Sequence, residues 1–388
     1  MNILYFTQIF YPKLFGGGEY IFFQWATELA KRGHHVYVIT QRLQDTPSYE
    51  KVNGIHVFRV GSILNLKGTL PVGVLSNLSF LVSSFLKGIE IARKNKIDVI
   101  HSNTYIPVIS AQACSGIMRI PHVATVHDVY YTSRKDFWDM WSSQSGVSSS
   151  IKFLGPLVEK IVTKMPVTLF HTVSQKSKSD LEAMGVSKNI LVIPNGINYA
   201  DYDAKNNAIC LQAIFVGRLV FYKNIDVIID AFGLVVKKIP DAKLIIVGEG
   251  PTKYDLIKKV DLLGLSKSIS FTGNISHQDK VKLISESQVL LNPSLVEGFG
   301  IVVLEGFACG KPVIVSDSKP LSDLVDDSID GYVVPAHNPD VWAEKIADLI
   351  SNPKKSQEMG ETGKKKAISK YSISKVTDDL LDLYKQVT

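Results

Sequence analysis

The stretch that decides the fold runs from Asn292 to Val313 and reads NPSLVEGFGIVVLEGFACGKPV. An apolar run precedes it, a loop then carries Glu297, and a helical pattern begins near Phe299, which predicts a strand, a loop and a helix in succession. Free N–H groups at the start of a helix bind anions, and Gly298 and Gly300 let a ligand approach the backbone closely. The stretch is therefore typical of a phosphate-binding unit in an α/β protein.

Two carboxylates, Glu297 and Glu305, flank this loop with seven residues between them. If the stretch between them were all helical, they would lie about 12 Å apart along the axis. That span suits hydroxyl groups at the two ends of a nucleotide-diphosphate sugar, with Glu297 facing the sugar and Glu305 the ribose. The alternative is a charge that stabilises the helix start and a solvated helix residue. The apolar neighbours Val302, Val303 and Phe307 disfavour that alternative for Glu305.

Similar units of strand and helix extend along the chain on both sides of this stretch, and they predict two doubly wound α/β domains. We expect domains over 1–194 and 208–371, a linker over 195–207, and a last helix over 372–388. Ligands of such sheets bind at the carboxyl ends of the strands. The predicted strands are 2–7, 35–40, 55–60, 98–101, 123–127, 167–173 and 190–193 in the first half, and 213–217, 242–248, 270–272, 289–291 and 312–315 in the second.

The composition is that of a globular protein, because 45% of the 388 residues are hydrophobic and 21% are charged. The three cysteines are odd in number and far apart, which excludes a disulfide framework and favours a reducing cytosol. No basic segment precedes the first apolar run, so we expect no signal peptide. The longest uncharged stretch, 68–86, contains Pro71, Asn77 and four serines, so we expect it to be too polar to span a membrane.

The charges are distributed unevenly between the two halves of the chain. Residues 1–195 contain 20 Lys and Arg against 12 Asp and Glu, whereas residues 196–388 contain 23 against 25. This asymmetry indicates that the first half meets an acidic partner, such as a phospholipid surface or a phosphorylated substrate. A basic face that is merely solvated is the open alternative.

Two cations, Arg218 and Lys223, lie five residues apart in the loop that follows a predicted strand ending at Gly217. Arginine binds phosphate oxygens through two parallel hydrogen bonds, and lysine adds a point charge. Together they can neutralise a leaving diphosphate, although a basic surface loop would show the same pattern.

The first half contains two further candidate motifs, each after a predicted strand. Gly16, Gly17 and Gly18 open a helix after the first strand, where they form either a ligand-contacting loop or a flexible turn. His127 and Asp128 follow a later strand, and His127 there can bind a sugar hydroxyl, transfer a proton or serve only the structure.

Three other patterns only resemble known sites. Gly248-Glu-Gly250 lacks the third glycine of a dinucleotide fingerprint, and the stretch 306–311 is one residue short of a P-loop. Asp201-Tyr-Asp203 has the spacing of a metal-binding pair but lies in the predicted linker. We therefore expect no metal site.

Taken in order, these motifs resemble those of the retaining GT-B glycosyltransferases of family 4. The resemblance covers nearly the whole chain and rests on 16–18, 127–128, 193–196, 217–224 and 297–305. It implies two Rossmann-like domains that face each other across a cleft, with a final helix that crosses back to the N-terminal, acceptor-binding domain. It also implies a nucleotide-sugar donor bound by the C-terminal domain, retention of anomeric configuration and no metal.

The resemblance also implies a role for each candidate residue. Arg218 and Lys223 would bind the diphosphate, Glu305 the ribose, Glu297 the sugar hydroxyls, and His127 the transferred sugar near its anomeric carbon. The remaining donor contacts would come from Gly17 at the phosphate, from Gly273, Asn274 and Ile275 at the base, and from Phe299, Gly300 and Ile301 at the phosphate-binding loop.

The acceptor is less clearly indicated. Family members with lipid-linked acceptors often have a basic and apolar face on the N-terminal domain. Residues 62–96 and 134–164 resemble such a face, with Trp138, Trp141 and Phe153 near Lys135, Lys152 and Lys160. The alternative is that these apolar residues pack in the core.

We therefore expect a cytoplasmic hexosyltransferase, peripheral on the membrane if that face is real. Its donor would be a UDP-, GDP- or ADP-linked sugar, and its acceptor a glycan, a lipid-linked saccharide or a glycolipid. The alternatives are a related synthase with a soluble acceptor, an NAD-dependent oxidoreductase and a non-catalytic sugar-binding protein.

Overall fold

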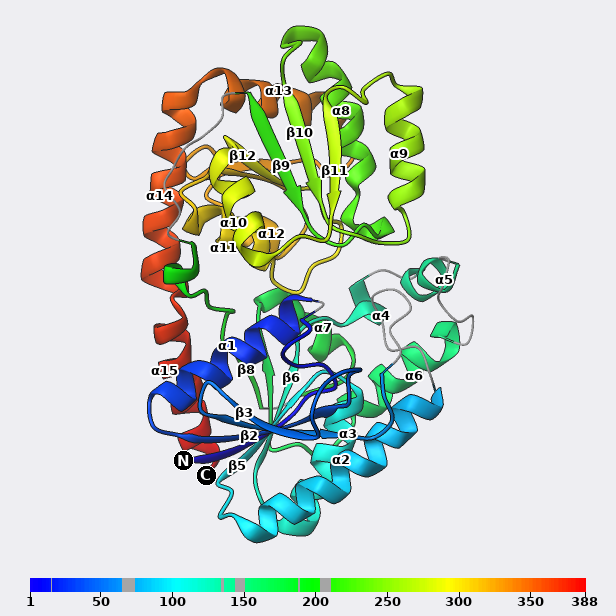
Figure 1. The fold of residues 1–388 in the computed structure, drawn as a ribbon, viewed down its shortest axis with the longest axis vertical. Coiled ribbons are helices and arrows are strands. Elements are labelled where there is room, and N and C mark those ends of the chain that lie inside the picture. The colour runs from blue at the N-terminus through cyan, green and yellow to red at the C-terminus, as the bar shows by residue number, and fades with distance from the viewer. Residues whose placement is uncertain (15, 65–73, 134–135, 144–150, 188, 203–210) are drawn as a thin grey trace. The chain divides into compact units, whose positions relative to one another are not determined.

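The computed structural model describes residues 1–14, 16–64, 74–133, 136–143, 151–187, 189–202 and 211–388. The chain forms two compact units, each of which is an α/β domain with a mainly parallel sheet (Figure 1). Unit 1 consists of Met1–Gly196 together with Ile373–Thr388, and unit 2 consists of Ile197–Ser372.

The sheet of unit 1 has the strand order β3-β4-β2-β1-β5-β6-β7-β8, and all its neighbouring strands are parallel except β3 and β4. The central strands are buried along their whole length, as expected when helices cover both faces of a parallel sheet. The strands are β1 Asn2–Phe6, β2 His35–Gln41, β3 Tyr49–Val52, β4 Ile55–Val60, β5 Val99–Asn103, β6 His122–Val126, β7 Leu169–Thr172 and β8 Ile190–Val192.

The helices of unit 1 connect these strands and include the last helix of the chain, α15. Arg32 at the end of α1 binds Asp378 of α15 at 2.5 Å, and the two helices lie side by side in Figure 1. The helices are α1 Gly17–Lys31, α2 Val74–Lys94, α3 Ile106–Met118, α4 Tyr130–Ser133, α5 Phe137–Ser142, α6 Ile151–Thr163, α7 Gln175–Ala183 and α15 Ile373–Val387.

A chain of buried hydrogen bonds joins α15 to the middle of this sheet. The Tyr384 hydroxyl of α15 lies 2.9 Å from the Tyr5 hydroxyl and 2.6 Å from His101 Nδ1. The other nitrogen of His101 lies 2.6 Å from Thr125 Oγ1, which lies 2.8 Å from His171 Nδ1. All five side chains are buried, so the final helix is part of the interior of unit 1.

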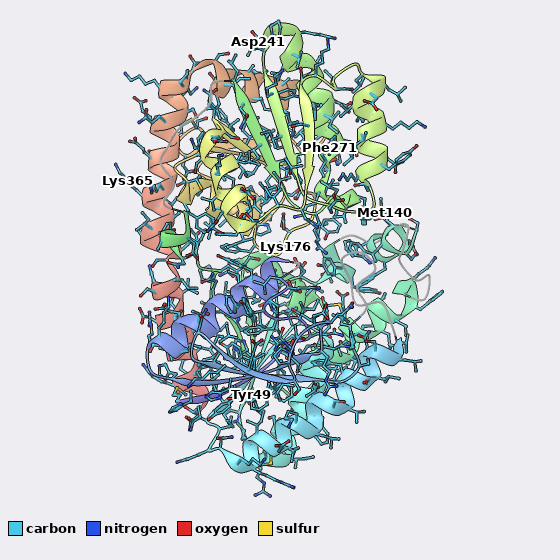
Figure 2. All side chains as sticks on the ribbon, viewed as in Figure 1. Tyr49, Met140, Lys176, Asp241, Phe271 and Lys365 are labelled. Atoms are coloured by element: carbon cyan, nitrogen blue, oxygen red, sulfur yellow. The ribbon has the colours of Figure 1, made fainter. Side chains whose placement is uncertain are left out.

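The sheet of unit 2 has the order β11-β10-β9-β12-β13-β14 and is parallel throughout. Figure 2 labels Phe271 on its edge strand β11 and Tyr49 on the edge strand β3 of unit 1. The strands are β9 Gln212–Val216, β10 Lys243–Val247, β11 Ile269–Gly273, β12 Val289–Asn292, β13 Val313–Ser316 and β14 Gly331–Val334.

One large apolar core, formed from both sheet and helices, holds unit 2 together, with Phe232 and Trp342 among its fully buried side chains. The helices are α8 Ile225–Lys238, α9 Lys253–Leu262, α10 His277–Glu286, α11 Ile301–Ala308, α12 Leu321–Leu324, α13 Pro339–Ser351 and α14 Pro353–Tyr371, with short 3-10 helices at Tyr199–Tyr202 and Phe221–Lys223.

Two strands and the starts of two helices differ from the sequence prediction. The strands β3 and β14 were not predicted, because each has four residues and lies at a sheet edge. The helix α1 begins at Gly17, so it already includes two of the three glycines that were expected to lead into it. The helix α11 begins at Ile301 rather than near Phe299.

The helix α2 has an unusual distribution of apolar residues. Its inner face is formed by small and apolar residues such as Phe80, Ser84 and Gly88, while large apolar side chains point outward. By length and composition alone α2 could cross a membrane, a test that core helices of soluble proteins also pass, but only 22% of its most apolar window is buried. The sequence predicts that 68–86 is too polar for this, but the helix extends to Lys94, and residues 65–73 lie outside the described residues.

Candidate active site

The candidate residues of unit 2 gather at the carboxyl ends of its parallel strands. Arg218 and Lys223 follow β9, Gly273 ends β11, and Glu297 follows β12 in the loop before α11. Because β9 lies between β10 and β12, these loops share one edge of the sheet, where ligands of such domains bind.

One of the predicted phosphate-binding residues, Lys223, is paired with the predicted sugar-binding residue, Glu297. Lys223 Nζ forms an ion pair with Glu297 Oε1, and both side chains are about 15% exposed. The Arg218 guanidinium donates to the Tyr222 hydroxyl at 2.7 Å. The two cations and the carboxylate are therefore held in place by neighbouring side chains of the same edge.

Glu305 is almost completely buried, with 3% of its surface exposed. Its Oε1 atom accepts hydrogen bonds from Lys280 Nζ at 2.6 Å and from the Tyr202 hydroxyl at 2.8 Å. Both contacts are made to the same oxygen, and within the described part of the chain Oε2 has no hydrogen-bond partner. One oxygen of a rigidly held carboxylate therefore remains able to accept a hydrogen bond.

Neither Lys280 nor Tyr202 was predicted as a site residue. Lys280 lies on the amphipathic helix α10, whose pattern does not distinguish it from a solvated lysine. Tyr202 lies in the stretch 195–207 that we predicted as a linker, but it is 1% exposed and belongs to unit 2. Residues 203–207 of that stretch are outside the described residues.

The loop before α11 depends on a glycine. Gly300 has φ +98° and forms the N-cap of α11, and a Cβ atom there would lie 2.6 Å from Leu321 Cδ2. The stretch from Gly298 to Gly300 is not helical, so the estimate of 12 Å along a continuous helix between Glu297 and Glu305 does not hold. Ile301 begins the helix, whose first N–H groups have no partner within it.

The loop after β11 begins at Gly273, which has φ +71°. Side chains rarely adopt this backbone conformation, so glycine is favoured at the start of the turn. A Cβ atom at Gly273 would also lie 2.7 Å from Glu249 Oε1, the flexible end of a side chain that could move away. Asn274 is exposed and Ile275 is half-buried, and both precede α10.

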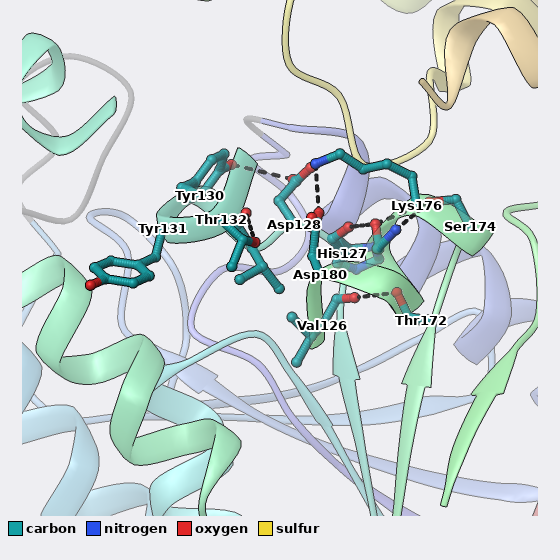
Figure 3. Close-up of polar contacts among 12 residues, drawn as sticks. Val126, His127, Asp128, Tyr130, Tyr131, Thr132, Thr172, Ser174, Lys176 and Asp180 are labelled. Atoms are coloured by element: carbon teal, nitrogen blue, oxygen red, sulfur yellow. Dashed lines mark hydrogen bonds and ion pairs between the residues drawn. The ribbon is translucent and has the colours of Figure 1, made fainter. Parts of the chain in front are cut away.

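In unit 1, His127 is the first residue after β6 and is 9% exposed. Its Nε2 atom lies 3.1 Å from Asn103 Oδ1, and its carbonyl oxygen accepts a hydrogen bond from the Ser177 hydroxyl at 2.8 Å. Figure 3 shows His127 surrounded by residues of the β6 and β7 ends. Since the amide oxygen of Asn103 only accepts, we assign the imidazole proton to Nε2, and Nδ1 is an acceptor.

Burial lowers the pKa of His127 to about 3, so its imidazole is neutral at physiological pH. A neutral imidazole can exchange hydrogen bonds with a sugar hydroxyl, but it is a weak base for removing a proton. Of the two chemical roles considered for His127, hydrogen bonding to a ligand is the better supported.

The glycine-rich loop packs directly against this histidine. A Cβ atom at Gly18 would lie 3.0 Å from His127 Cδ2, so the first turn of α1 approaches the imidazole because residue 18 is a glycine. Gly17, the first residue of α1, lies in the same turn. The two N-terminal motifs are therefore one structural cluster.

A buried carboxylate, Glu159 of α6, fixes the segment that follows His127. Its two oxygens accept hydrogen bonds from the backbone N–H groups of Tyr130 and Tyr131 at 2.9 and 3.0 Å, and Oε1 also accepts one from the Tyr105 hydroxyl at 2.6 Å. The Tyr105 hydroxyl also contacts the carbonyl oxygen of Asp128. This role of Glu159 was not predicted from the sequence.

Like Glu159, Lys176 of unit 1 is a residue that sequence reasoning missed. It lies in the first turn of α7 and extends past His127 toward Asp128 (Figure 3), and it forms an ion pair with Asp180 at 2.5 Å. Its position four residues after Thr172, where β7 ends, is the signal that could have identified it, because ligands bind at this edge of the sheet.

Comparison with known proteins connects this geometry to a family. Residues 15–201 match the model described as Glycosyltransferase Family 4, and residues 210–366 match the model described as Glycosyl transferases group 1. The chain belongs to glycosyltransferase family 4. It is therefore a glycosyltransferase with the GT-B fold, as the motifs predicted.

Relatives with this architecture cover almost the whole chain. An uncharacterised glycosyltransferase of Methanocaldococcus jannaschii is 27% identical and covers 99% of this chain and 98% of its own. The alpha-monoglucosyldiacylglycerol synthase of Streptococcus pneumoniae is 25% identical over 91% of this chain and 79% of its own.

Solved structures show the same fold. Sucrose-phosphate synthase from Thermosynechococcus elongatus has a TM-score of 0.79 and 20% identity, covering 100% of this chain and 99% of its own. Anabaena HepE in complex with UDP-glucose has a TM-score of 0.76 and 18% identity, with full coverage of both chains.

Proposed function

We propose that this glycosyltransferase moves a hexose from a nucleotide-diphosphate sugar to a glycan, lipid-linked or glycolipid acceptor, with retention of configuration. The observation that carries the proposal is the group of Arg218, Lys223 and Glu297 beside the start of α11. Two cations and free helix N–H groups suit a diphosphate, and the carboxylate suits sugar hydroxyls.

In this proposal Arg218 and Lys223 stabilise the diphosphate as the glycosidic bond breaks and its negative charge grows. Lys223 then exchanges its contact with Glu297 for the phosphate, which releases Glu297 to accept from the sugar. Because the two side chains supply positive charge at the leaving group, the reaction requires no metal.

The remaining donor contacts follow from the same arrangement. The free Oε2 of Glu305 accepts from the ribose, and the loop Gly273–Ile275 contacts the base. From unit 1, Gly17 offers its backbone to the phosphate. The neutral imidazole of His127 binds a hydroxyl of the transferred sugar.

The comparisons support the substrate classes without assigning them to this chain. One solved structure with this fold holds UDP-glucose, which supports a nucleotide-sugar donor. One relative is named for a glucosylated diacylglycerol, which supports a lipid acceptor.

We also propose that unit 1 docks on the cytoplasmic face of a membrane through α6. The outer face of this helix exposes Phe153, Leu157 and Ile161 at 74%, 51% and 42%. Lys152 and Lys160 lie beside them and are exposed. An amphipathic helix with lysines next to apolar residues binds anionic lipid surfaces.

Part of the docking face predicted from the sequence is wrong. Trp141 is 5% exposed and stacks on Phe137, so it belongs to the core, and Trp138 is half-buried. Lys135 and the other residues of 134–135 and 144–150 lie outside the described residues.

Thermal-shift measurements with UDP-, GDP- and ADP-sugars and with NAD test the donor class. We expect stabilisation by one nucleotide sugar and its loss in the Arg218→Ala variant. Lys237→Ala, which removes a cation from the last turn of α8, is the control and keeps the shift. Stabilisation by NAD alone would refute the proposal.

Co-sedimentation with anionic and neutral vesicles tests docking. Binding to anionic vesicles should weaken with salt and in a Phe153→Ser variant. Protein that stays in solution with both vesicle types at low salt would indicate a soluble acceptor.

A further inference from the structure

A row of uncharged polar side chains crosses the carboxyl edge of the unit 1 sheet, beginning at His127. Asn103 at the end of β5 contacts His127, and Asn103 Nδ2 donates to Thr7 Oγ1 at 3.3 Å. Gln8 follows β1, and Gln41 ends β2. Since the strand order is β2-β1-β5-β6, these residues occupy four adjacent strand ends.

Gln41 is the fixed centre of the far part of this row. It is fully buried, and its Nε2 atom donates to Ser76 Oγ at 2.6 Å and to the carbonyl oxygen of Ser62 at 3.1 Å. Its Oε1 atom accepts from Gln8 Nε2 at 2.9 Å. Gln8 Nε2 also donates to Asn77 Oδ1 at 2.7 Å. Gln41 therefore orients Gln8, and Gln8 in turn binds Asn77; both of these amides are half-buried.

This arrangement leaves two complementary atoms with unused hydrogen-bonding capacity. Within the described part of the chain, Gln8 Oε1 and Asn77 Nδ2 have no hydrogen-bond partner. Gln8 Oε1 is an acceptor and Asn77 Nδ2 is a donor. Together they can bind two hydroxyls of one sugar, because a hydroxyl can both donate and accept a hydrogen bond. Gln8 follows β1, which is two strands from β6 in the sheet. Because neighbouring strands are about 4.8 Å apart, Gln8 lies about 10 Å from His127.

The same helix that carries Asn77 has an apolar outer face next to it. Leu75, Leu78, Val82 and Leu86 of α2 are 82%, 53%, 54% and 60% exposed and follow helical spacing. No charged residue occurs between Val74 and Leu86. A surface of this kind suits an uncharged apolar chain rather than a phosphate.

We propose that Gln8 and Asn77 form an acceptor subsite for an uncharged, hydroxyl-rich sugar whose apolar tail lies on Leu75, Leu78 and Val82. The acceptor is then a neutral glycolipid that presents its reacting hydroxyl near His127. This inference rests on the proposed function, because it takes His127 as the end of the row where transfer occurs.

Equilibrium binding of octyl glycosides below their micelle concentration tests the subsite in the full-length protein. The probes are octyl glucoside, octyl galactoside, octyl maltoside and octyl lactoside, with free maltose and lactose as sugars without a tail and octyl glucuronide as an anionic analogue. We expect at least one neutral octyl glycoside to bind, more tightly than its free sugar and than the glucuronide.

Variants separate the two parts of the subsite. Gln8→Ala and Asn77→Ala each remove a hydrogen bond to the sugar and should weaken binding about tenfold, with or without the tail. Leu78→Ser, an exposed change that leaves the fold intact, should remove the advantage of the tail only. Asn95→Ala removes a half-buried amide at the other end of α2 and should change nothing.

The subsite is refuted if none of the neutral octyl glycosides binds, if Gln8→Ala and Asn77→Ala both bind like the wild type, or if the glucuronide binds as tightly. Titration with UDP, GDP and ADP in parallel tests the proposed function separately. Nucleotide binding without glycoside binding overturns only the subsite, whereas the absence of any nucleotide binding overturns the proposed function.

Discussion

Replacing Lys280 with methionine should destabilise unit 2 through Glu305. Methionine keeps the length of the side chain but removes the ammonium group that lies 2.6 Å from Glu305 Oε1. Glu305 is 3% exposed, so its carboxylate would be left with the Tyr202 hydroxyl as its partner. A buried charge without its counter-ion is unfavourable because water cannot solvate it.

The size of the effect follows from the burial of the two partners. Removing one partner of a buried ion pair costs about 3–5 kcal/mol of unfolding free energy. The Lys280 side chain is 21% exposed, so we expect the lower end, about 3 kcal/mol. For a domain of this size that corresponds to a decrease of about 6–12 °C in the unfolding temperature.

Circular dichroism during thermal and urea unfolding measures this change in Lys280→Met, Glu305→Gln and the double variant. Glu305→Gln should rescue much of the loss in the Lys280→Met background, with a coupling energy of about 1.5 kcal/mol or more. Lys282→Met is the control, because Lys282 lies on the same helix, is 71% exposed and is 3.9 Å from Glu286. Equal stability of Lys280→Met and Lys282→Met would refute the reasoning.

Three further outcomes can be measured directly. His127→Gln should lower turnover at least tenfold. Because the pKa of His127 is about 3, titration of this residue should cause no change in the wild-type rate between pH 5.5 and 8.5. Burial lowers the pKa of His122 to about 3 and of His171 to about 4, so only the unfolded chain takes up these protons below pH 6.5. The urea-unfolding free energy should therefore fall by about 1.4 kcal/mol per histidine between pH 7.5 and 5.5, and an increase would contradict this. Gly300→Ala should cost about 1–3 kcal/mol in the same assay, since its φ is +98°, and an unchanged midpoint would argue against strain there.

Much of the fold was predictable because it depends on local pattern. The buried strands of both sheets are continuous apolar runs, and each ends in a loop with glycine or polar residues, so their order gave the two α/β domains. The motif residues Arg218, Lys223, Glu297 and His127 were found because they lie in the loops that follow such strands.

The partners of these residues were not predictable, because they come from distant segments. Lys280 reaches Glu305 from another helix, and Tyr202 reaches it across 103 positions of the chain. Tyr384 contacts His101 across 283 positions. For the apolar stripe within 62–96, the sequence left open whether it is an exposed docking face or part of the core, since helical spacing shows that a stripe exists but not which way it faces. The structure exposes Leu75, Leu78 and Val82 of α2.

The position of α15 within unit 1 affects how this protein is made. Residues 197–372 of unit 2, 176 in all, are synthesised between the body of unit 1 and its last helix. At about 5–20 residues per second, this interval lasts about 10–35 s. During that time Tyr5 and His101 lack the Tyr384 hydroxyl that they contact in the finished domain. On a ribosome, unit 2 can therefore complete its fold first, although the chain of unit 1 begins earlier.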